Sequence, residues 1–389
     1  MSAEVADTER AGPKLTKKLF AAWAVIGLIL SLASAAAAHE NSNPLSGEKP
    51  GEKSGEKIDR TMTVDPAAIV TLCVASGTLN VRGWDKNEIH VRSMDAAQIE
   101  FRRIDKVKDQ TRPAARVDVM VLDKATGANP KLDCQALASV EMDVPAGSTV
   151  QVQTRDGDIM IAGVAAAYAG SQNGDIEVER VTKLVEAGSL GGSIFLKDSS
   201  GRVNLSSASG GLEVVNVRAV TDDDTFEVGT VSGDIQLNRV SNPKVTAKTV
   251  NGALSMTGPL AKSGVYGFTN MTGDVILSMP RDASFQLNAK LSEKHDILSD
   301  FPLKYLSEPP PPRPAAKPGK SAVEAPPKPP DAKGKVLSRT GPVVAPIVVE
   351  KPTVIGNQYV LRRVSAVCGT GDATISIASF GGTVRLKKI

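Results

Sequence analysis

Aspartate side chains recur next to glycines and are the first candidates for chemistry in this sequence. Asp158, Asp175, Asp234 and Asp274 each follow a glycine directly. Carboxylates on neighbouring strands can bind calcium or act as the acid and base of a glycosidase. However, Ser193, Gly211 and Ala253 interrupt the pattern, and the period of about nine residues typical of calcium-binding β-rolls is absent. We therefore interpret the aspartates as turn residues.

The remaining candidate residues also favour structural roles. His39, His90 and His295 lie far apart without a partner motif, so the sequence predicts neither a zinc site nor a Ser–His triad. Trp84 and Tyr168 have aromatic rings that can stack on sugars, but Trp84 follows a strand and a glycine turn, and we interpret it as capping the first coil of a repeat. We predict no catalytic, cofactor-binding or metal-binding residue, and no cofactor.

The sequence contains three cysteines: Cys73, Cys134 and Cys368. In an oxidising compartment two of them can pair and leave one thiol, and the sequence does not say which two. The alternative is that each is a small buried strand residue.

A glycine-centred repeat indicates the strands on which these side chains lie. Its anchors are Gly157, Gly174, Gly192, Gly210, Gly233, Gly252, Gly273 and Gly382, and a looser copy centres on Gly77. Aliphatic residues stand two and four positions after most anchors, and aliphatic, aromatic or small residues stand five and seven before. A polar column stands three before: Thr154, Ser171, Ser189, Ser207, Thr230, Thr249, Asn270 and Ser379. We interpret these polar groups as structural, bonded to neighbouring backbone.

The repeat predicts a stack of β-coils. Strand side chains alternate with period two, and the phase slips by one residue at the glycine, as a corner between two short strands requires. Within the main block the anchors are 17 to 23 residues apart, which is one coil. A single coil cannot bury its apolar face, so coils must stack. We expect an all-β, single-chain β-solenoid, a right-handed β-helix of about ten coils, with an N-terminal β-rich cap. Tyr266 and Phe268 are expected in its core.

The chain divides into six expected segments. These are a signal peptide (1–38), a flexible Gly-Glu-Lys spacer (39–60), the first coil and cap (61–148), the solenoid repeats (149–303), a disordered Pro/Lys-rich loop (304–344) and a terminal coil (345–389) that closes the C-terminal end. Within the cap, Asp95 is expected to begin a short helix that runs to Asp109.

The N-terminus and the overall charge indicate where the protein acts. Lysines precede an apolar run from Leu19 to Leu32 and a polyalanine exit, which is typical of a cleaved signal peptide; an uncleaved anchor is the alternative. We expect export to the periplasm or the cell surface, with the membrane contacted only through the signal segment. The net charge of +3 gives no case for nucleic-acid binding.

Three stretches carry a family resemblance: Val74 to Trp84, Val144-Pro145-Ala-Gly, and Ser-Gly-Asp-Ile at 232–235. Across residues 60–303 and 355–389 the chain resembles the bacterial "putative adhesin" family of uncharacterised envelope proteins, which is similar to auto-transporter adhesin heads. The resemblance implies a β-solenoid and lends no catalytic residues. We expect a non-catalytic exported binding or scaffold module, with a glycan or an envelope component as partner. The alternatives are a periplasmic envelope-stress or structural component and, disfavoured, a carbohydrate-active β-helix enzyme.

Overall fold

A computed structural model describes residues 57–105, 111–122, 134–292, 295–306 and 361–389. The chain separates into two compact units, 1–53 and 54–389, and every described residue belongs to the second. The expected signal peptide, most of the spacer and nearly all of the Pro/Lys-rich segment therefore lie outside the described residues. Among those that are described there is no helix of any kind, and hence none long and apolar enough to cross a membrane.

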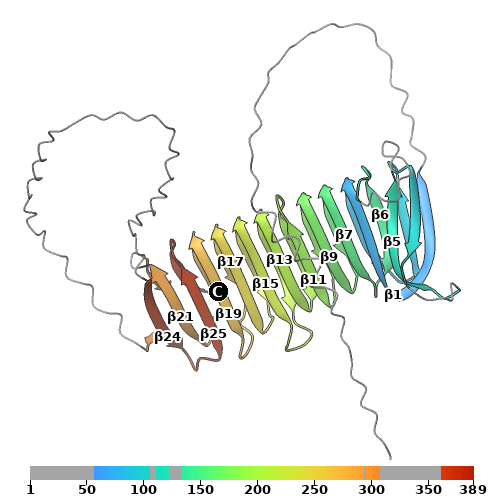
Figure 1. Ribbon diagram of the computed structural model, residues 1–389. Helices are drawn as coiled ribbons and strands as arrows, with labels where there is room; N and C mark the ends of the chain where they lie inside the picture. Colours follow the sequence, from blue (N-terminus) through green and yellow to red (C-terminus); the bar gives the residue numbers. More distant parts are fainter. Residues whose placement is uncertain (1–56, 106–110, 123–133, 293–294, 307–360) are drawn as a thin grey trace, which may run out of the picture. The chain divides into compact units, whose positions relative to one another are not determined.

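The described part of the second unit forms 26 strands, and Figure 1 shows how they follow one another along the chain. In chain order they are β1 (Ile58–Ser76), β2 (Leu79–Trp84), β3 (Glu88–Ser93), β4 (Gln98–Arg103), β5 (Ala114–Leu122), β6 (Val140–Pro145), β7 (Thr149–Asp156), β8 (Ile159–Ala162), β9 (Ala166–Asn173), β10 (Ile176–Glu179), β11 (Leu184–Ser189), β12 (Ile194–Ser200), β13 (Arg202–Ser209), β14 (Leu212–Arg218), β15 (Thr225–Ser232), β16 (Ile235–Val240), β17 (Lys244–Asn251), β18 (Leu254–Thr257), β19 (Val265–Thr272), β20 (Val275–Met279), β21 (Phe285–Ser292), β22 (Ile297–Ser299), β23 (Lys304–Tyr305), β24 (Leu361–Cys368), β25 (Ala373–Ser379) and β26 (Val384–Lys388).

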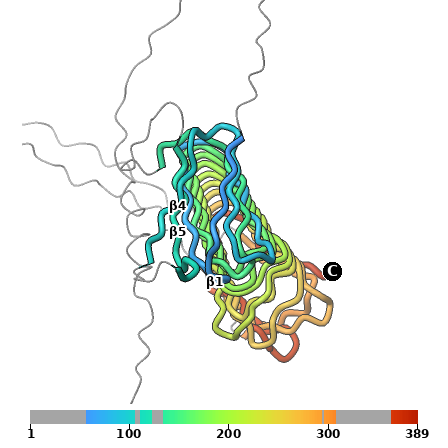
Figure 2. The backbone as a smooth tube through the Cα atoms, turned by 90° about the vertical axis from the view of Figure 1, so that its right-hand side faces the viewer, coloured from blue at the N-terminus to red at the C-terminus, as the bar shows by residue number. Residues whose placement is uncertain are grey.

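The strands form two mostly parallel sheets, as a β-solenoid requires. Sheet A runs in the order β1, β3, β6, β2, β8, β10, β12, β14, β16, β18, β20, β26, β22. Sheet B runs in the order β4, β5, β1, β7, β9, β11, β13, β15, β17, β19, β25, β21, β24, β23. Each coil gives one strand to each sheet, and Figure 2 shows successive coils lying behind one another. The all-β solenoid class expected from the repeat is confirmed.

The core lies between the two sheets and follows the predicted columns. In the coil of Gly233, for example, Phe226, Val228, Ile235 and Leu237 are all buried. Tyr266 and Phe268 are at most 1% exposed, as their inward positions predict. Because the register between neighbouring strands matches column to column, the same repeat position lies above itself in each coil, as in the pairing of Phe226 with Val203 and Val245.

The glycine column has a reason beyond backbone freedom. A Cβ built on Gly174 would lie 2.0 Å from the carbonyl oxygen of Gly157 in the preceding coil, and one built on Gly192 would lie 2.0 Å from the oxygen of Gly174. Neither glycine needs a positive φ. The glycines therefore stack directly on one another, and any side chain at these corners would push two coils apart.

The N-terminal end is closed by antiparallel strands. The long strand β1 joins the two sheets, because Ile58–Thr63 pairs with β3 in sheet A and the later residues pair with β5 and β7 in sheet B. The helix expected from Asp95 to Asp109 is wrong, since residues 98–103 form β4, which pairs antiparallel with β5. The alternation of apolar residues at Ile99 and Phe101 is the strand signal that outweighs the capping residue.

A disulfide between Cys73 and Cys134 ties this end together, and Cys368 is a buried free thiol whose pKa is raised by burial.

Residues 345–389 are expected to close the C-terminal end, and of them β24 does lie on the outer edge of β21. Within the described part of that range, β25 pairs with β19 on one side and β21 on the other, and β26 lies between β20 and β22. The last coil of the sequence is thus inserted one coil inside the end. Every coil offers the same apolar columns, so the repeat pattern alone does not fix the level at which this coil docks.

Candidate functional site

The aspartates that follow glycines are used to join coils. Asp158 Oδ1 accepts a hydrogen bond from the backbone N–H of Asp175 at 2.9 Å, and Asp175 Oδ1 accepts one from Ser193 N–H at 2.7 Å. Asp234 and Asp274 do the same for Ala253 and Thr383, at 2.7 and 2.9 Å. Neighbouring aspartates therefore do lie on adjacent coils, as expected, but one oxygen of each is bonded to the next corner. No group of three or more metal-binding side chains occurs in the described part of the chain.

The buried Ser/Thr column is also used for stacking, which is the structural role that the sequence predicts. Ser207 Oγ donates to the carbonyl oxygen of Gly192 at 2.9 Å, and Thr230 Oγ1 donates to that of Gly210 at 3.0 Å. Ser171, Ser189, Thr249 and Asn270 make the equivalent bond to the glycine of the preceding coil, at 2.9 to 3.2 Å. These groups satisfy the glycine carbonyls at the corner and face the interior, where no ligand can reach them.

A second column, at the far end of the sheet A strands, is strained. Arg180, Asp198, Asn216 and Arg239 occupy equivalent places in four successive coils, and all four have φ between 49° and 57°. This left-handed conformation costs a non-glycine residue roughly 1 kcal/mol or more, and such outliers cluster at ligand sites. The glycines at the flanking levels, Gly163 and Gly258, also have positive φ.

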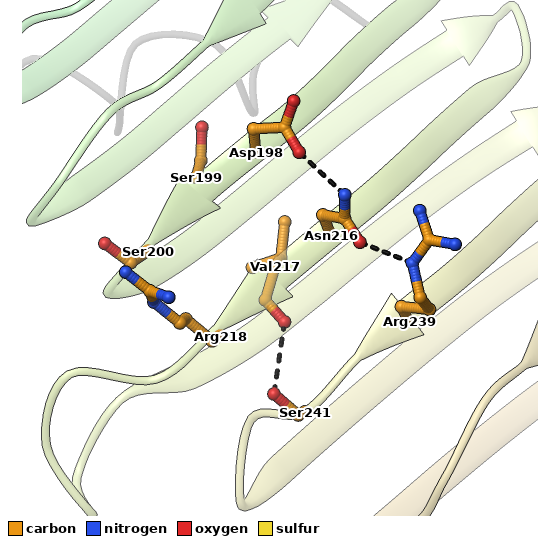
Figure 3. A pocket seen from close by; sticks show the side chains of 8 residues that line it. All are labelled: Asp198, Ser199, Ser200, Asn216, Val217, Arg218, Arg239 and Ser241. Atoms are coloured by element: carbon orange, nitrogen blue, oxygen red, sulfur yellow. Dashed lines mark hydrogen bonds between the residues drawn. The ribbon is translucent and has the colours of Figure 1, made fainter.

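Side chains of this strained column form a hydrogen-bonded ladder over three coils (Figure 3). Asn216 Nδ2 donates to Asp198 Oδ1 at 2.7 Å, and Arg239 Nε donates to Asn216 Oδ1. The ladder therefore holds the Arg239 guanidinium in place through its Nε and leaves its two terminal nitrogens for other partners.

The ladder borders a groove of about 350 Å³. Ser199 and Val217 lie buried at its floor, while Arg218 and Arg239 are exposed. Ser200 and Ser241 complete the lining, and Figure 3 places the Arg218 guanidinium beside Ser200. Neither arginine has a carboxylate partner among the described residues. The groove thus presents two guanidinium groups to solvent, an arrangement suited to carboxylate, sulfate or phosphate oxygens.

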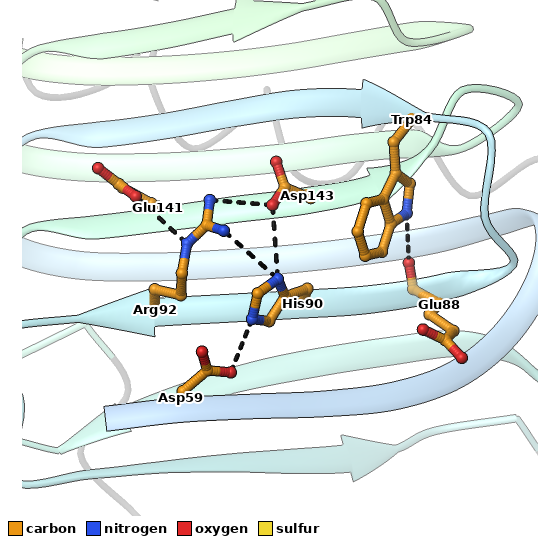
Figure 4. Close-up of polar contacts among 7 residues, drawn as sticks. All are labelled: Asp59, Trp84, Glu88, His90, Arg92, Glu141 and Asp143. Carbon is orange, nitrogen blue, oxygen red and sulfur yellow. Dashed lines mark hydrogen bonds and ion pairs between the residues drawn. The ribbon is translucent and has the colours of Figure 1, made fainter. Parts of the chain in front are cut away.

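A polar cluster lies on β1, β3 and β6 at the N-terminal end (Figure 4). His90 Nε2 lies 2.6 Å from Asp59 Oδ1, and its Nδ1 lies 3.6 Å from Asp143 Oδ2, which also pairs with Arg92 at 2.9 Å. The Trp84 ring stacks on His90 with centroids 6.0 Å apart, and its Nε1 donates to the Glu88 carbonyl at 2.8 Å.

Both ring nitrogens of His90 face carboxylates, those of Asp59 and Asp143, so the cluster is best explained as a network that fastens three strands. Lys86 Nζ adds a cation–π contact, 4.7 Å from the centre of the Trp84 ring. Trp84 is therefore engaged with its neighbours in the first coils, in line with the capping role that the sequence suggested for it. Asp59 and Asp143 are 31 and 53 residues away from His90 in the sequence, so no local motif contains the three residues together.

On the outer face of sheet B, Tyr168 pairs in register with Glu186. Partial burial raises the pKa of both side chains, and the charge of Glu186 raises that of Tyr168 further. Tyr168 is half-buried and lacks a second aromatic ring beside it among the described residues, so a sugar-stacking platform is not formed here.

These features define a class of protein: a β-solenoid whose repeated polar side chains build the stack, with an arginine-bordered groove on one edge. The chain belongs to the Toastrack DUF4097 family, which matches residues 76–304. This match confirms the resemblance suggested by the sequence. None of the curated proteins matches the chain.

Several solved structures are similar at low sequence identity. One is a putative adhesin from Bacteroides fragilis, with 10% identity over 87% of this chain and 100% of that one and a TM-score of 0.33. Another is a putative cell adhesion protein from Clostridium sporogenes, with 9% identity over 86% and 100% and a TM-score of 0.18. A putative adhesin from Parabacteroides merdae matches 58% of this chain and 90% of its own at 10% identity, with a TM-score of 0.29. TM-scores this low support no inference about this chain.

Sequence reasoning missed the groove. Arg180, Asp198, Asn216 and Arg239 each stand six residues after the glycine of their coil and belong to none of the columns that define the repeat. A weak signal was available, because aspartate and asparagine are among the few side chains that tolerate a left-handed conformation. The two arginines gave no such signal.

Proposed function

We propose that this protein is an exported, non-catalytic binding module of the cell envelope, and that the groove bordered by Arg218 and Arg239 binds an anionic glycan. The observation that carries the proposal is the guanidinium of Arg239, held by the Asp198–Asn216 ladder, together with a second arginine, Arg218, that lines the same groove; neither has a carboxylate partner among the described residues. The side chains that could have done catalysis in the repeat are instead bonded to neighbouring coils.

Export is supported by two features of the chain. The apolar run from Leu19 to Leu32 with its polyalanine exit has the form of a signal peptide. The Cys73–Cys134 disulfide is a bond that persists in oxidising compartments such as the periplasm and the cell surface.

The ligand class follows from the charges and the shape. Two guanidinium groups above a floor of serine hydroxyls and a valine suit a sugar that carries a carboxylate or sulfate and also offers a C–H face. The carboxylate of Asp198 also lines the groove and keeps its charge while accepting the Asn216 hydrogen bond, so the two guanidinium groups outweigh one carboxylate there. A neutral glycan would leave both arginines unused.

Binding to the purified full chain tests the proposal. A panel of carboxylated, sulfated and neutral oligosaccharides is titrated by calorimetry against the wild type, the double variant R218Q/R239Q and the matched control R82Q. Arg82 is exposed on sheet A, outside the groove. Charge-assisted hydrogen bonds are worth about 1.5–3 kcal/mol, so the double variant should bind an acidic glycan at least about tenfold more weakly. R82Q should stay within about twofold. Equal affinity of all three proteins, or binding of neutral glycans only, would refute the groove assignment.

Location is tested separately. The exposed Met271 is replaced by cysteine and intact cells are treated with a membrane-impermeant maleimide. Labelling of intact cells supports a surface module. Labelling only after the outer layer is opened favours the alternative, a periplasmic structural or envelope-stress component, and absence of labelling in both would contradict export.

A further inference from the structure

The C-terminal strands β24 and β25 pair with the two edges of a third strand, β21, instead of with each other. We call residues 361–388, which form β24, β25 and β26, the clasp. Its first two strands are consecutive and joined by the turn 369–372, the usual arrangement of a hairpin. Yet β24 pairs antiparallel with β21 while β25 pairs parallel with the other edge of β21. The strand β21 therefore lies between the two arms of the clasp, and Leu287 faces Ala366 on one side and Ile375 on the other.

The turn of the clasp is anchored on the residue that precedes β21. Ser284 Oγ accepts hydrogen bonds from the backbone N–H groups of Thr370, Gly371 and Asp372, at 3.0, 2.9 and 3.2 Å. One hydroxyl thus satisfies three N–H groups of the turn, which fixes the clasp against the body of the stack.

The clasp fills a slot between two coils. On one side of it lie β19 and β20, and on the other lie β21 and β22. Its inward residues Ile375, Ile377, Val384 and Leu386 are at most 2% exposed and continue the core columns of both neighbours. An empty slot would expose apolar core on both walls, so the slot must be filled for the end of the stack to be stable.

The walls of the slot and the clasp that fills it are distant in the sequence. All strands of the walls precede residue 306, and the clasp begins at residue 361. The 54 residues 307–360 separate them. At most about 3.3 Å per residue, a connection of that length can reach on the order of 180 Å, far more than the few coils it must pass. Chain length therefore does not restrict the clasp to the slot of its own chain.

We propose that the slot is an interaction site for a second copy of this chain, and that copies join by exchanging clasps. Every strand pair, every buried side chain and the Ser284 anchor are the same whether the clasp comes from the same chain or from another. Which clasp fills the slot then depends only on the effective concentration of each clasp at that slot. A long connection lowers the effective concentration of the chain's own clasp. Exchange is favoured where copies are crowded or fold side by side. This interaction goes beyond the proposed glycan binding and does not depend on it.

Single cysteines on two different full-length chains test the exchange. Thr269 on β19 and Ala378 on β25 are register partners whose side chains lie on the outer face of sheet B. One chain carries T269C with an affinity tag, and the other carries A378C without one. They are refolded together at several total concentrations, oxidised and analysed on non-reducing gels, with the cross-linked peptide identified by mass spectrometry. The matched control replaces T269C by K248C, one strand further from β25.

Exchange predicts a T269C–A378C cross-link between chains, and a tenfold rise in concentration should raise the ratio of linked to unlinked chains about tenfold. The K248C control should give none. A chain carrying both T269C and A378C should form the bond within one molecule at low concentration, which verifies that the register is formed. The pair N288C and S376C repeats the test on the other wall of the slot. An intrachain bond without any interchain bond at every concentration would overturn the proposal, as would a cross-link to K248C as strong as that to T269C.

Discussion

Two glycines four residues apart should respond to alanine in opposite ways. Gly170 and Gly174 belong to the same coil, and neither has a positive φ, so backbone conformation does not distinguish them. Their surroundings do. A Cβ on Gly170 would have the Cγ of Gln153 as its nearest neighbour, at 3.7 Å, which is an ordinary contact. A Cβ on Gly174 would lie 2.0 Å from the carbonyl oxygen of Gly157 and 2.5 Å from its carbon.

The cost at Gly174 can be estimated from what must move. An ordinary contact needs more than 1 Å of additional separation between two coils at this corner. The hydrogen bonds from Gly157 N–H to the Asn173 carbonyl and from Ile159 N–H to the Asp175 carbonyl are 3.1 and 2.9 Å long, and a shift of 1 Å breaks them. Overpacking costs about 1–3 kcal/mol and each lost bond about 1 kcal/mol, so Gly174→Ala should destabilise this region by about 2–5 kcal/mol.

Gly170→Ala should instead stabilise the strand by about 0.4–1 kcal/mol, because alanine restricts the unfolded chain and fits the folded one. Stacked repeats unfold by regions, so a local assay is needed beside urea unfolding. Hydrogen exchange of peptides covering 166–179 provides it. Faster exchange in Gly174→Ala and unchanged or slower exchange in Gly170→Ala is the expected result. Equal behaviour of the two variants would show that the direct stacking of glycines does not govern this corner.

Three further changes test other parts of the structure. Replacing Cys73 and Cys134 by serine should lower the free energy of unfolding by up to about 4 kcal/mol, as expected for a loop with a sequence separation of 61, and reductant should then have no further effect in urea titrations. Burial raises the pKa of Glu186, so its charge opposes folding fully above the folded pKa and not at all below the unfolded one. Glu186→Gln should therefore raise the urea midpoint at neutral pH and lose that advantage in acid; a gain independent of pH would contradict this cause. Ser284→Ala should cost about 1–3 kcal/mol by orphaning N–H groups of the turn 369–372, seen as faster hydrogen exchange confined to the clasp. Unchanged exchange there would mean that the hydroxyl is not the anchor.

The sequence was most informative where the structure is periodic. The solenoid, its inward columns and the structural role of the Ser/Thr column all follow from offsets to a glycine, because strand geometry converts a period of two into a face. A glycine suits such a corner because it tolerates both a positive φ and a close approach of backbone. The sequence does not say which of the two applies at a given coil. At Gly174 and Gly192 it is the close approach, because the carbonyl oxygen of the coil below occupies the place of a side chain.

The ends of the stack and the groove depended on contacts that periodicity does not contain. Asp95 was misread as a helix cap because its local signal is real, and only the pairing of β4 with β5 decides in favour of a strand. His90 acquires Asp59 and Asp143 as partners through strand pairing across the cap. Arg218 and Arg239 line one groove only because their coils stack. In each case the determining contact is long-range and specific to one level of the stack.

The same property explains both the success and the failure of the repeat as a guide. Because each coil presents nearly the same columns to the next, the repeat identifies what a coil is and leaves open where it docks. The final coil could sit at the end, yet β25 lies between β19 and β21. What selects that level is not repeated: the antiparallel strand β24 needs the outer edge of β21, and the turn needs Ser284. Both requirements bind the clasp to one slot, and neither distinguishes the slot of its own chain from that of an identical neighbour. The coils are interchangeable, and β21 and Ser284 alone set the level of the clasp. Two copies can therefore exchange clasps without losing any contact.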